Sequence, residues 1–89
     1  MIKPAVLIVN DNPASLLVLR TVLETAPDAS TYDIVTATSG DETLRLLLHH
    51  EFAVILLDVN MPELDGFATV EIMRTSRRGA DVPIIFVTA

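Results

Sequence analysis

The stretch Ala53-Val54-Ile55-Leu56-Leu57 is a continuous aliphatic run that ends at an aspartate, Asp58. Its unbroken apolar character and β-branched members predict a strand that is buried on both faces. Two runs of the same kind, 5–9 and 84–87, lie near the two ends of the chain. A fourth run, 32–37, is interrupted by polar residues, which indicates a strand near a sheet edge.

The segment after the first run has the signals of a helix start. Asn12 is a good N-cap residue, and proline follows it at the first helical position, so we expect a helix from there to about Thr25. Its apolar residues spread over most of the circumference, which predicts packing partners on two sides. They are Ala14, Leu16, Leu17, Val18, Leu19, Val22 and Leu23.

Two further helices are expected between the remaining runs. Ser39-x-x-Glu42 is a capping box and predicts a helix that buries Leu44, Leu47 and Leu48 and has His49-His50 in its last turn. The third helix should run from about Gly66 to Arg74 and bury Phe67, Val70 and Met73. The order is therefore strand–helix three times and then a strand, which is typical of an α/β protein with three layers around an open parallel sheet.

Composition excludes several classes of protein. The 89 residues are 51% hydrophobic with a mean hydropathy of +0.50, so the chain has to bury a core and is not a disordered tail. Six basic and twelve acidic residues give a net charge of −6, which argues against a nucleic-acid or membrane surface. The longest apolar run, 52–57, is too short to span a bilayer. Cysteine is absent, which excludes disulfides, a zinc ribbon and a thiol nucleophile, and fits a reducing cytoplasmic location.

Polar residues follow three of the four predicted strands at their carboxyl ends. They are Asn10-Asp11 after the first, Asp58 after the third and Thr88 after the fourth. In an open parallel sheet these ends form one edge, where ligands bind. Two carboxylates placed close together repel unless a proton or a cation lies between them. Oxygen ligands without histidine or cysteine favour Mg²⁺.

Three segments, 7–13, 56–67 and 87–89, together resemble the receiver domain of two-component response regulators. The most specific is the loop Asp58-Val-Asn-Met61-Pro62-Glu-Leu-Asp65-Gly66 at the end of a buried strand. The resemblance implies a flavodoxin-like topology with strand order 2-1-3-4. It also implies that the domain is not an enzyme in the usual sense, although members of the family assist their own phosphorylation and dephosphorylation.

The same resemblance implies a role for each site residue. Asp58 would accept a phosphoryl group from a histidine kinase or a histidine phosphotransfer protein. Asp11, Asp58 and the backbone carbonyl of Asn60 would bind Mg²⁺, and Thr88 would hydrogen-bond the phosphoryl group. Asn10 stands where the family usually has an acid that reaches the metal through water, so we expect weaker Mg²⁺ binding rather than its loss.

The family pattern also continues beyond the last residue, through a fourth helix, a fifth strand that ends in a lysine, and a fifth helix. We therefore expect residues 1–89 to be a C-terminally truncated receiver domain, with a possible output domain in the parent protein. The uncovered apolar surfaces predict self-association of such a fragment.

Other interpretations remain open. A pseudo-receiver that binds partners without being phosphorylated is favoured by Asn10, and a metal-dependent hydrolase would lack a further general base. His49-His50 could suggest a phosphohistidine or metal site, but no second ligand group lies nearby in the sequence. The segment 63–66 resembles a haloacid-dehalogenase motif only superficially, and Asp65-Gly66 is better explained as the start of the third helix.

Overall fold

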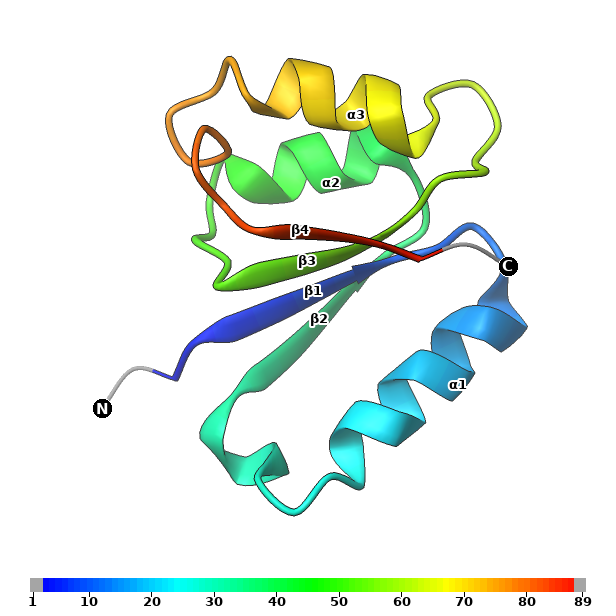
Figure 1. The fold of residues 1–89 in the computed structure, drawn as a ribbon, viewed down its shortest axis with the longest axis vertical. Coiled ribbons are helices and arrows are strands. Elements are labelled where there is room, and N and C mark those ends of the chain that lie inside the picture. Colours follow the sequence, from blue (N-terminus) through cyan, green and yellow to red (C-terminus); the bar gives the residue numbers. More distant parts are fainter. Residues whose placement is uncertain (1–2, 88–89) are drawn as a thin grey trace.

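Four parallel strands form the sheet of the computed structural model, which describes residues 3–87 (Figure 1). In chain order they are β1 (Ala5–Val9), β2 (Asp33–Ala37), β3 (Val54–Asp58) and β4 (Ile84–Val87). Their spatial order is β2-β1-β3-β4, so the predicted order 2-1-3-4 is confirmed. The polar-interrupted strand β2 lies at one edge, as expected. The aliphatic run 84–87 was predicted to be buried on both faces, but β4 lies at the other edge of the described sheet, where Ile85 is 54% exposed.

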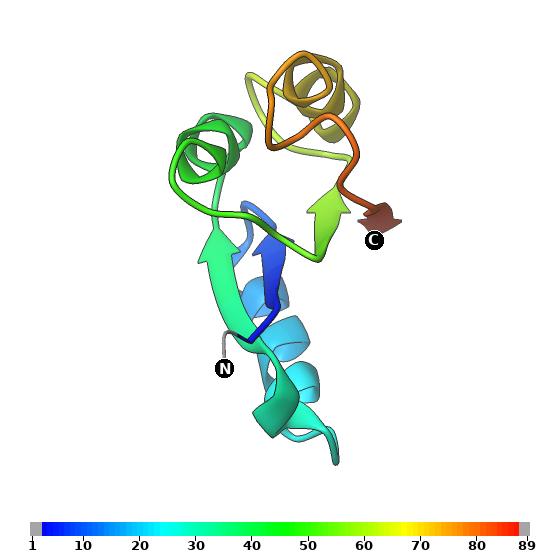
Figure 2. The same ribbon diagram turned by 90° about the vertical axis from the view of Figure 1, so that its left-hand side faces the viewer.

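Three α-helices connect the strands and cover the two faces of the sheet (Figures 1 and 2). Helix α1 (Pro13–Glu24) lies on one face, against β1 and β2. Helices α2 (Gly40–Leu47) and α3 (Gly66–Met73) lie side by side on the opposite face. The three-layer architecture is therefore confirmed. A short 3₁₀ helix, Ala29–Thr31, precedes β2 and was not expected from the sequence.

Side chains cap all three α-helices. Asn12 accepts hydrogen bonds from the amides of Ala14 and Ser15, at 2.9 and 3.2 Å. Ser39 accepts one from Glu42 at 3.0 Å, but the Glu42 carboxylate bonds the amide of Thr38 rather than that of Ser39, so the capping box closes one residue earlier than usual.

The third helix is capped by Asp65. Its side chain accepts a hydrogen bond from the amide of Ala68 at 2.8 Å, which confirms that Asp65 starts the third helix.

The core between the sheet and α2–α3 is built on alternate strand residues and on one helical methionine, all at most 1% exposed. These residues are Leu7, Val9, Ile55, Leu57 and Met73.

Several local expectations were wrong. Asp58 is the last residue of β3 rather than the first residue after it. Helix α2 ends at Leu47, so His49 and His50 follow it instead of forming its last turn, and their amides bond the carbonyl of Leu46. Leu48 and Phe67 were expected to be buried but are 67% and 57% exposed. Leu48 lies just after the end of α2, and Phe67 is covered only in part, by the ring of Phe86.

Helix α1 packs on the sheet with one side only. No side chain of this helix is fully buried, and Leu17, Val18 and Val22 are each more than 60% exposed. The second set of packing partners that the sequence predicts for this helix is not found within residues 3–87.

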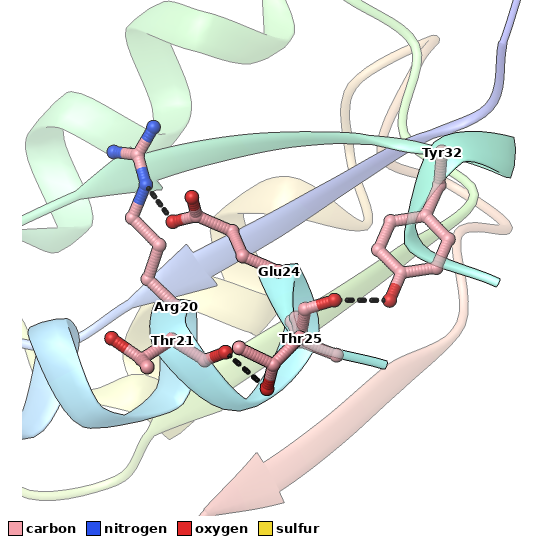
Figure 3. Close-up of polar contacts among 6 residues, drawn as sticks. Arg20, Thr21, Glu24, Thr25 and Tyr32 are labelled. Atoms are coloured by element: carbon pink, nitrogen blue, oxygen red, sulfur yellow. Dashed lines mark hydrogen bonds and ion pairs between the residues drawn. The ribbon is translucent and has the colours of Figure 1, made fainter. Parts of the chain in front are cut away.

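One hydrogen bond joins the end of α1 to the residue before β2 (Figure 3). The Tyr32 hydroxyl donates to the Leu23 carbonyl at 2.6 Å, a carbonyl in the last turn that the helix itself leaves without a partner. Within the helix end, the Thr25 hydroxyl donates at 2.8 Å to the Thr21 carbonyl, which also accepts the Thr25 amide at 3.0 Å. Arg20 and Glu24 form an exposed i,i+4 ion pair at 2.9 Å, a kind of pair that contributes only about 0.3–0.5 kcal/mol.

Candidate functional site at the carboxyl edge of the sheet

The strand register brings two predicted site residues together. Val9 of β1 pairs with Leu57 of β3, so Asn10 and Asp58 occupy equivalent positions on neighbouring strands. Neighbouring strands lie about 4.8 Å apart. Asp58 in turn pairs with Val87 of β4. The predicted convergence of these strand ends is therefore observed for the residues that the structure describes, whereas Thr88 lies outside them.

Asp58 is a buried carboxylate, only 6% exposed. Its Oδ1 accepts a hydrogen bond from the amide of Asn60 at 3.1 Å. The alternation of β3 directs Asp58 to the α1 side of the sheet, opposite Ile55 and Leu57. There it lines a cavity of about 350 Å³. The other lining residues are Asn10, Ala14, Ser15, Val18, Leu19 and Val87. The carboxylate can therefore be reached from one side, through a mainly apolar recess.

Asn10 organises the turn that leads from β1 into α1. It is 8% exposed, and its amide donates to the Ala37 carbonyl at 3.1 Å. Its Oδ1 accepts from the amide of Asn12 at 2.9 Å, and Asn12 in turn caps the helix. A carboxylate oxygen could accept the same bond, so the geometry of this turn does not require an amide at position 10.

The remaining predicted ligands lie beside this pair but not within the cavity. Asp11 follows Asn10 directly and is exposed, and Asn60 is exposed two residues after Asp58. His49 and His50 are exposed after α2, and the His50 ring stacks on Phe52 at 5.8 Å. The two histidines are not part of this site.

The loop after Asp58 is held by backbone contacts that we did not predict from the sequence. The Leu64 amide donates to the Pro62 carbonyl at 2.8 Å, which closes a three-residue turn around Glu63. Glu63 has φ of 67°, the left-handed conformation that costs a side-chain-bearing residue about 1–2 kcal/mol. The loop therefore adopts a strained conformation five residues after Asp58.

Gly66 allows the start of α3 to approach the backbone of β3 closely, whereas the sequence predicted only that it begins the helix. Its amide donates to the Val59 carbonyl at 3.0 Å. A Cβ at this position would lie 2.6 Å from the backbone oxygen of Asp58 and 3.0 Å from Cα of Val59. The Asp65-Gly66 pair thus combines a helix cap with a close approach to the backbone of Asp58, and this second role was available only from the structure.

The donor set at this edge fits a hard cation. Asp11 and Asp58 contribute carboxylates, Asn10 an amide oxygen and Asn60 a backbone carbonyl, all of them oxygen ligands of the kind that Mg²⁺ prefers. Between residues 3 and 87, no three histidine, cysteine or carboxylate side chains gather as a metal cluster. Because position 10 holds an amide and not a third carboxylate, the site carries one negative charge fewer than it would with an acid there.

Comparison with known proteins identifies the family to which this arrangement belongs. The model of the response regulator receiver domain family matches residues 6–89, nearly the whole chain. The chain is a response regulator receiver domain. The strand order 2-1-3-4 agrees with this assignment.

Relatives and solved structures agree with this assignment. The receiver domain is 42% identical over 83 residues to a protein-glutamate methylesterase/protein-glutamine glutaminase of Methanospirillum hungatei, and 37% identical over 86 residues to the transcriptional regulatory protein AfsQ1 of Streptomyces coelicolor. The two matches span 93% and 97% of this chain, but only 22% and 35% of the length of the relatives. These relatives therefore contain further regions beside the matched one.

A receiver domain of a sensor histidine kinase from Pseudomonas aeruginosa superposes with a TM-score of 0.85 at 28% identity. The match covers 99% of this chain and 69% of that one, and that structure holds a magnesium ion in its active-site cleft. In the described part of the present chain, no helix is both long and apolar enough to cross a membrane.

Proposed function

We propose that this receiver domain accepts a phosphoryl group on the side chain of Asp58. The observation that carries the proposal is a single buried carboxylate that ends a central strand, borders Asn10 and faces a cavity. A carboxylate oxygen would attack the phosphorus, the new P–O bond would form as the bond to the donor breaks, and the donor would leave with the electron pair.

Mg²⁺ is the ion that would assist this transfer. Asp11, Asp58, the Asn60 carbonyl and, through water, Asn10 would hold it, and a bound divalent cation neutralises charge on the transferring oxygens. The Asn60 amide, which already donates to Asp58 Oδ1, holds the carboxylate in one orientation. Thr88 is proposed to hydrogen-bond the phosphoryl group. The phosphoryl group carries about two negative charges, but the Asp58 carboxylate gives up its own charge when the new bond forms, so the site gains about one negative charge and three strong acceptor oxygens. This change can bias the neighbouring loops.

The proposed partner is a histidine kinase or a histidine phosphotransfer protein in the cytoplasm. Support comes from the receiver family and from a solved relative that is itself part of a sensor histidine kinase. An output domain in the parent protein is supported by the small share of the curated relatives' length that the chain covers. That the receiver domain continues beyond residue 89 also stays a prediction.

Intact-mass spectrometry tests the transfer. The chain would be incubated with acetyl phosphate and MgCl₂, alongside an Asp58→Asn variant and a sample with excess EDTA. We expect the mass of one phosphoryl group on the parent chain only. A full adduct on Asp58→Asn would show that another residue accepts the group and would remove the basis of the proposal.

The second candidate is a pseudo-receiver that binds partners without phosphorylation, and Asn10 is the observation that favours it. A Mg²⁺ titration followed by amide chemical shifts distinguishes the two. We expect shifts at Asp11, Asp58 and Asn60 with millimolar metal, and about tenfold tighter binding by Asn10→Asp, because that variant adds one negative charge next to the ion. An absence of binding by the parent chain, with binding restored in Asn10→Asp, would favour the pseudo-receiver.

A further inference from the structure

An apolar groove lies between the carboxyl-terminal ends of α2 and α3, on the side of the sheet away from the α1 face. Its volume is about 350 Å³, and it is lined by Leu44, Leu48, Ile72, Thr75, Arg77 and Arg78, among others. Leu48 and Ile72 are 67% and 47% exposed. The receiver site at Asp58 opens on the opposite face, so this groove is not part of it.

Two arginines stand at one end of the groove. Arg78 Nη1 donates to the Leu48 carbonyl at 3.1 Å, which ties the loop after α3 to the end of α2. Among residues 3–87 the one salt bridge is Arg20–Glu24, so neither Arg77 nor Arg78 is neutralised by an ion pair. No lining residue of the groove is acidic, although the whole chain carries a net charge of −6.

A second cavity, of about 490 Å³, lies on the other side of the same arginines. Glu51, Phe52 and Asp81 are among the residues that line it. Its acidic residues therefore border this neighbouring cavity and not the apolar groove. Arg77 and Arg78 line both cavities. Each guanidinium has five N–H donors, so it can donate to a ligand seated in the groove.

We propose that the α2–α3 groove docks an acidic amphipathic helix of a partner protein. Helices α2 and α3 lie side by side (Figure 2), and the groove lies between their carboxyl-terminal ends, where a third helix can pack. From the helices it takes in Leu44 and Leu47 of α2 and Ile72 of α3, so it seats about one turn of the partner, with apolar anchors at i and at i+3 or i+4.

Charge complementarity selects the polar residues of that partner. Arg77 and Arg78 favour carboxylates on the flank of the docked helix, while Leu48 and Ile72 contact its apolar face. A basic helix would lose the contact with the arginines, and an acidic segment without apolar anchors would leave the two exposed side chains uncovered. The net charge of −6 also disfavours a nucleic acid as the occupant.

Fluorescence anisotropy on the 89-residue chain tests the proposal with a defined probe. The probe is a labelled, lactam-constrained helix of about 14 residues with leucines along one face and glutamates elsewhere. Two control peptides replace the glutamates by lysine or the leucines by serine. We expect binding of the probe, and at least tenfold weaker binding of both controls. Equal binding of the serine control, or no binding of the probe at millimolar protein, would overturn the proposal.

Matched variants locate the binding surface. Leu48→Gln should weaken binding about tenfold, whereas Leu17→Gln, which changes an equally exposed leucine on α1, should leave it unchanged. Arg77→Gln should weaken it three- to tenfold at low salt, and Arg20→Gln on α1 should have no effect. The reverse pattern, with the loss on α1, would contradict the proposal.

Chemical-shift mapping on the parent chain provides a readout that does not depend on any variant folding correctly. The probe should shift the amides of residues 44–48 and 72–78. Shifts confined to α1 would assign the binding to the other face of the sheet and overturn the proposal.

Discussion

Gly66→Ala is expected to disturb the backbone of the phosphoacceptor itself. A Cβ at position 66 would lie 2.6 Å from the Asp58 carbonyl oxygen, about 0.8 Å short of the 3.4 Å at which ordinary contact begins. Its other close neighbours, Val59 Cα at 3.0 Å and the Asp58 carbonyl carbon at 3.2 Å, are backbone atoms too. No rotation of a side chain can relieve the overlap, so the start of α3 or the end of β3 has to move.

The expected change in the free energy of unfolding of Gly66→Ala is the difference between two opposing contributions. Overpacking of this kind typically costs 1–3 kcal/mol. Alanine recovers up to about 1 kcal/mol of helix propensity relative to glycine. The free energy of unfolding should therefore fall by about 1–2 kcal/mol, and the amides of Val59 and Asn60 should change their chemical shifts.

Gly40→Ala is the matched control, because Gly40 also occupies the first position of a capped helix. A Cβ there would contact the side chains of Thr69 and Leu64 rather than any backbone atom of β3. Urea denaturation followed by circular dichroism should show a loss of stability in both variants, with shifts at Val59 and Asn60 in Gly66→Ala only. A Gly66→Ala chain that is as stable as the parent, with unchanged shifts at those amides, would refute the reasoning.

Three further predictions concern the turns and the sheet edge. Asn12→Ala should lower the free energy of unfolding by about 1 kcal/mol through loss of the α1 cap, while Asn12→Asp should keep it; thermal or urea unfolding measures both. Glu63→Gly should leave stability unchanged or raise it by up to about 1 kcal/mol, because glycine adopts positive φ without strain, and a clear loss in urea would count against the strained turn. The outer edge of β4, with Ile85 54% and Phe86 39% exposed, should promote concentration-dependent self-association, which Ile85→Lys should reduce in sedimentation velocity; a parent chain that stays monomeric at high concentration would contradict this.

The strands and helix starts were predictable because each depends on a short local pattern. The aliphatic runs specified the strands, although only β1 and β3 lie inside the described sheet and β4 is partly exposed at its edge. Asn12, Ser39 and Asp65 marked the three helix starts. Asp58 was expected at the carboxyl-terminal edge of the sheet because it follows directly on the aliphatic run 53–57. The placement of Asn10-Asp11 and Asp58 at one edge followed from the rule that parallel strands end at a common edge, but which of the first two residues faces the cavity with Asp58 did not.

The extent of burial was less predictable, because periodicity shows which helix face is apolar but not whether a partner covers it. Leu48 has the spacing of a core residue, yet it lies 67% exposed at the end of α2. Phe67 contacts the ring of Phe86 at 4.9 Å and remains more than half exposed. Both depend on what packs over them, which is long-range information.

The contacts around the site loop were unpredictable for a related reason. The approach of Gly66 to the Asp58 backbone joins residues eight positions apart, and the positive φ of Glu63 has no glycine or asparagine to signal it. Such features depend on how the loop returns from β3 to α3.

The most direct test of the central claim is to locate the phosphoryl group after reaction with acetyl phosphate and MgCl₂. Borohydride reduction converts an aspartyl phosphate to homoserine, and peptide mapping by mass spectrometry then identifies the modified residue. We expect homoserine at position 58 and at no other aspartate. Modification at Asp11, phosphorylation at His49 or His50, or an unmodified chain under conditions where Mg²⁺ binds would contradict this expectation.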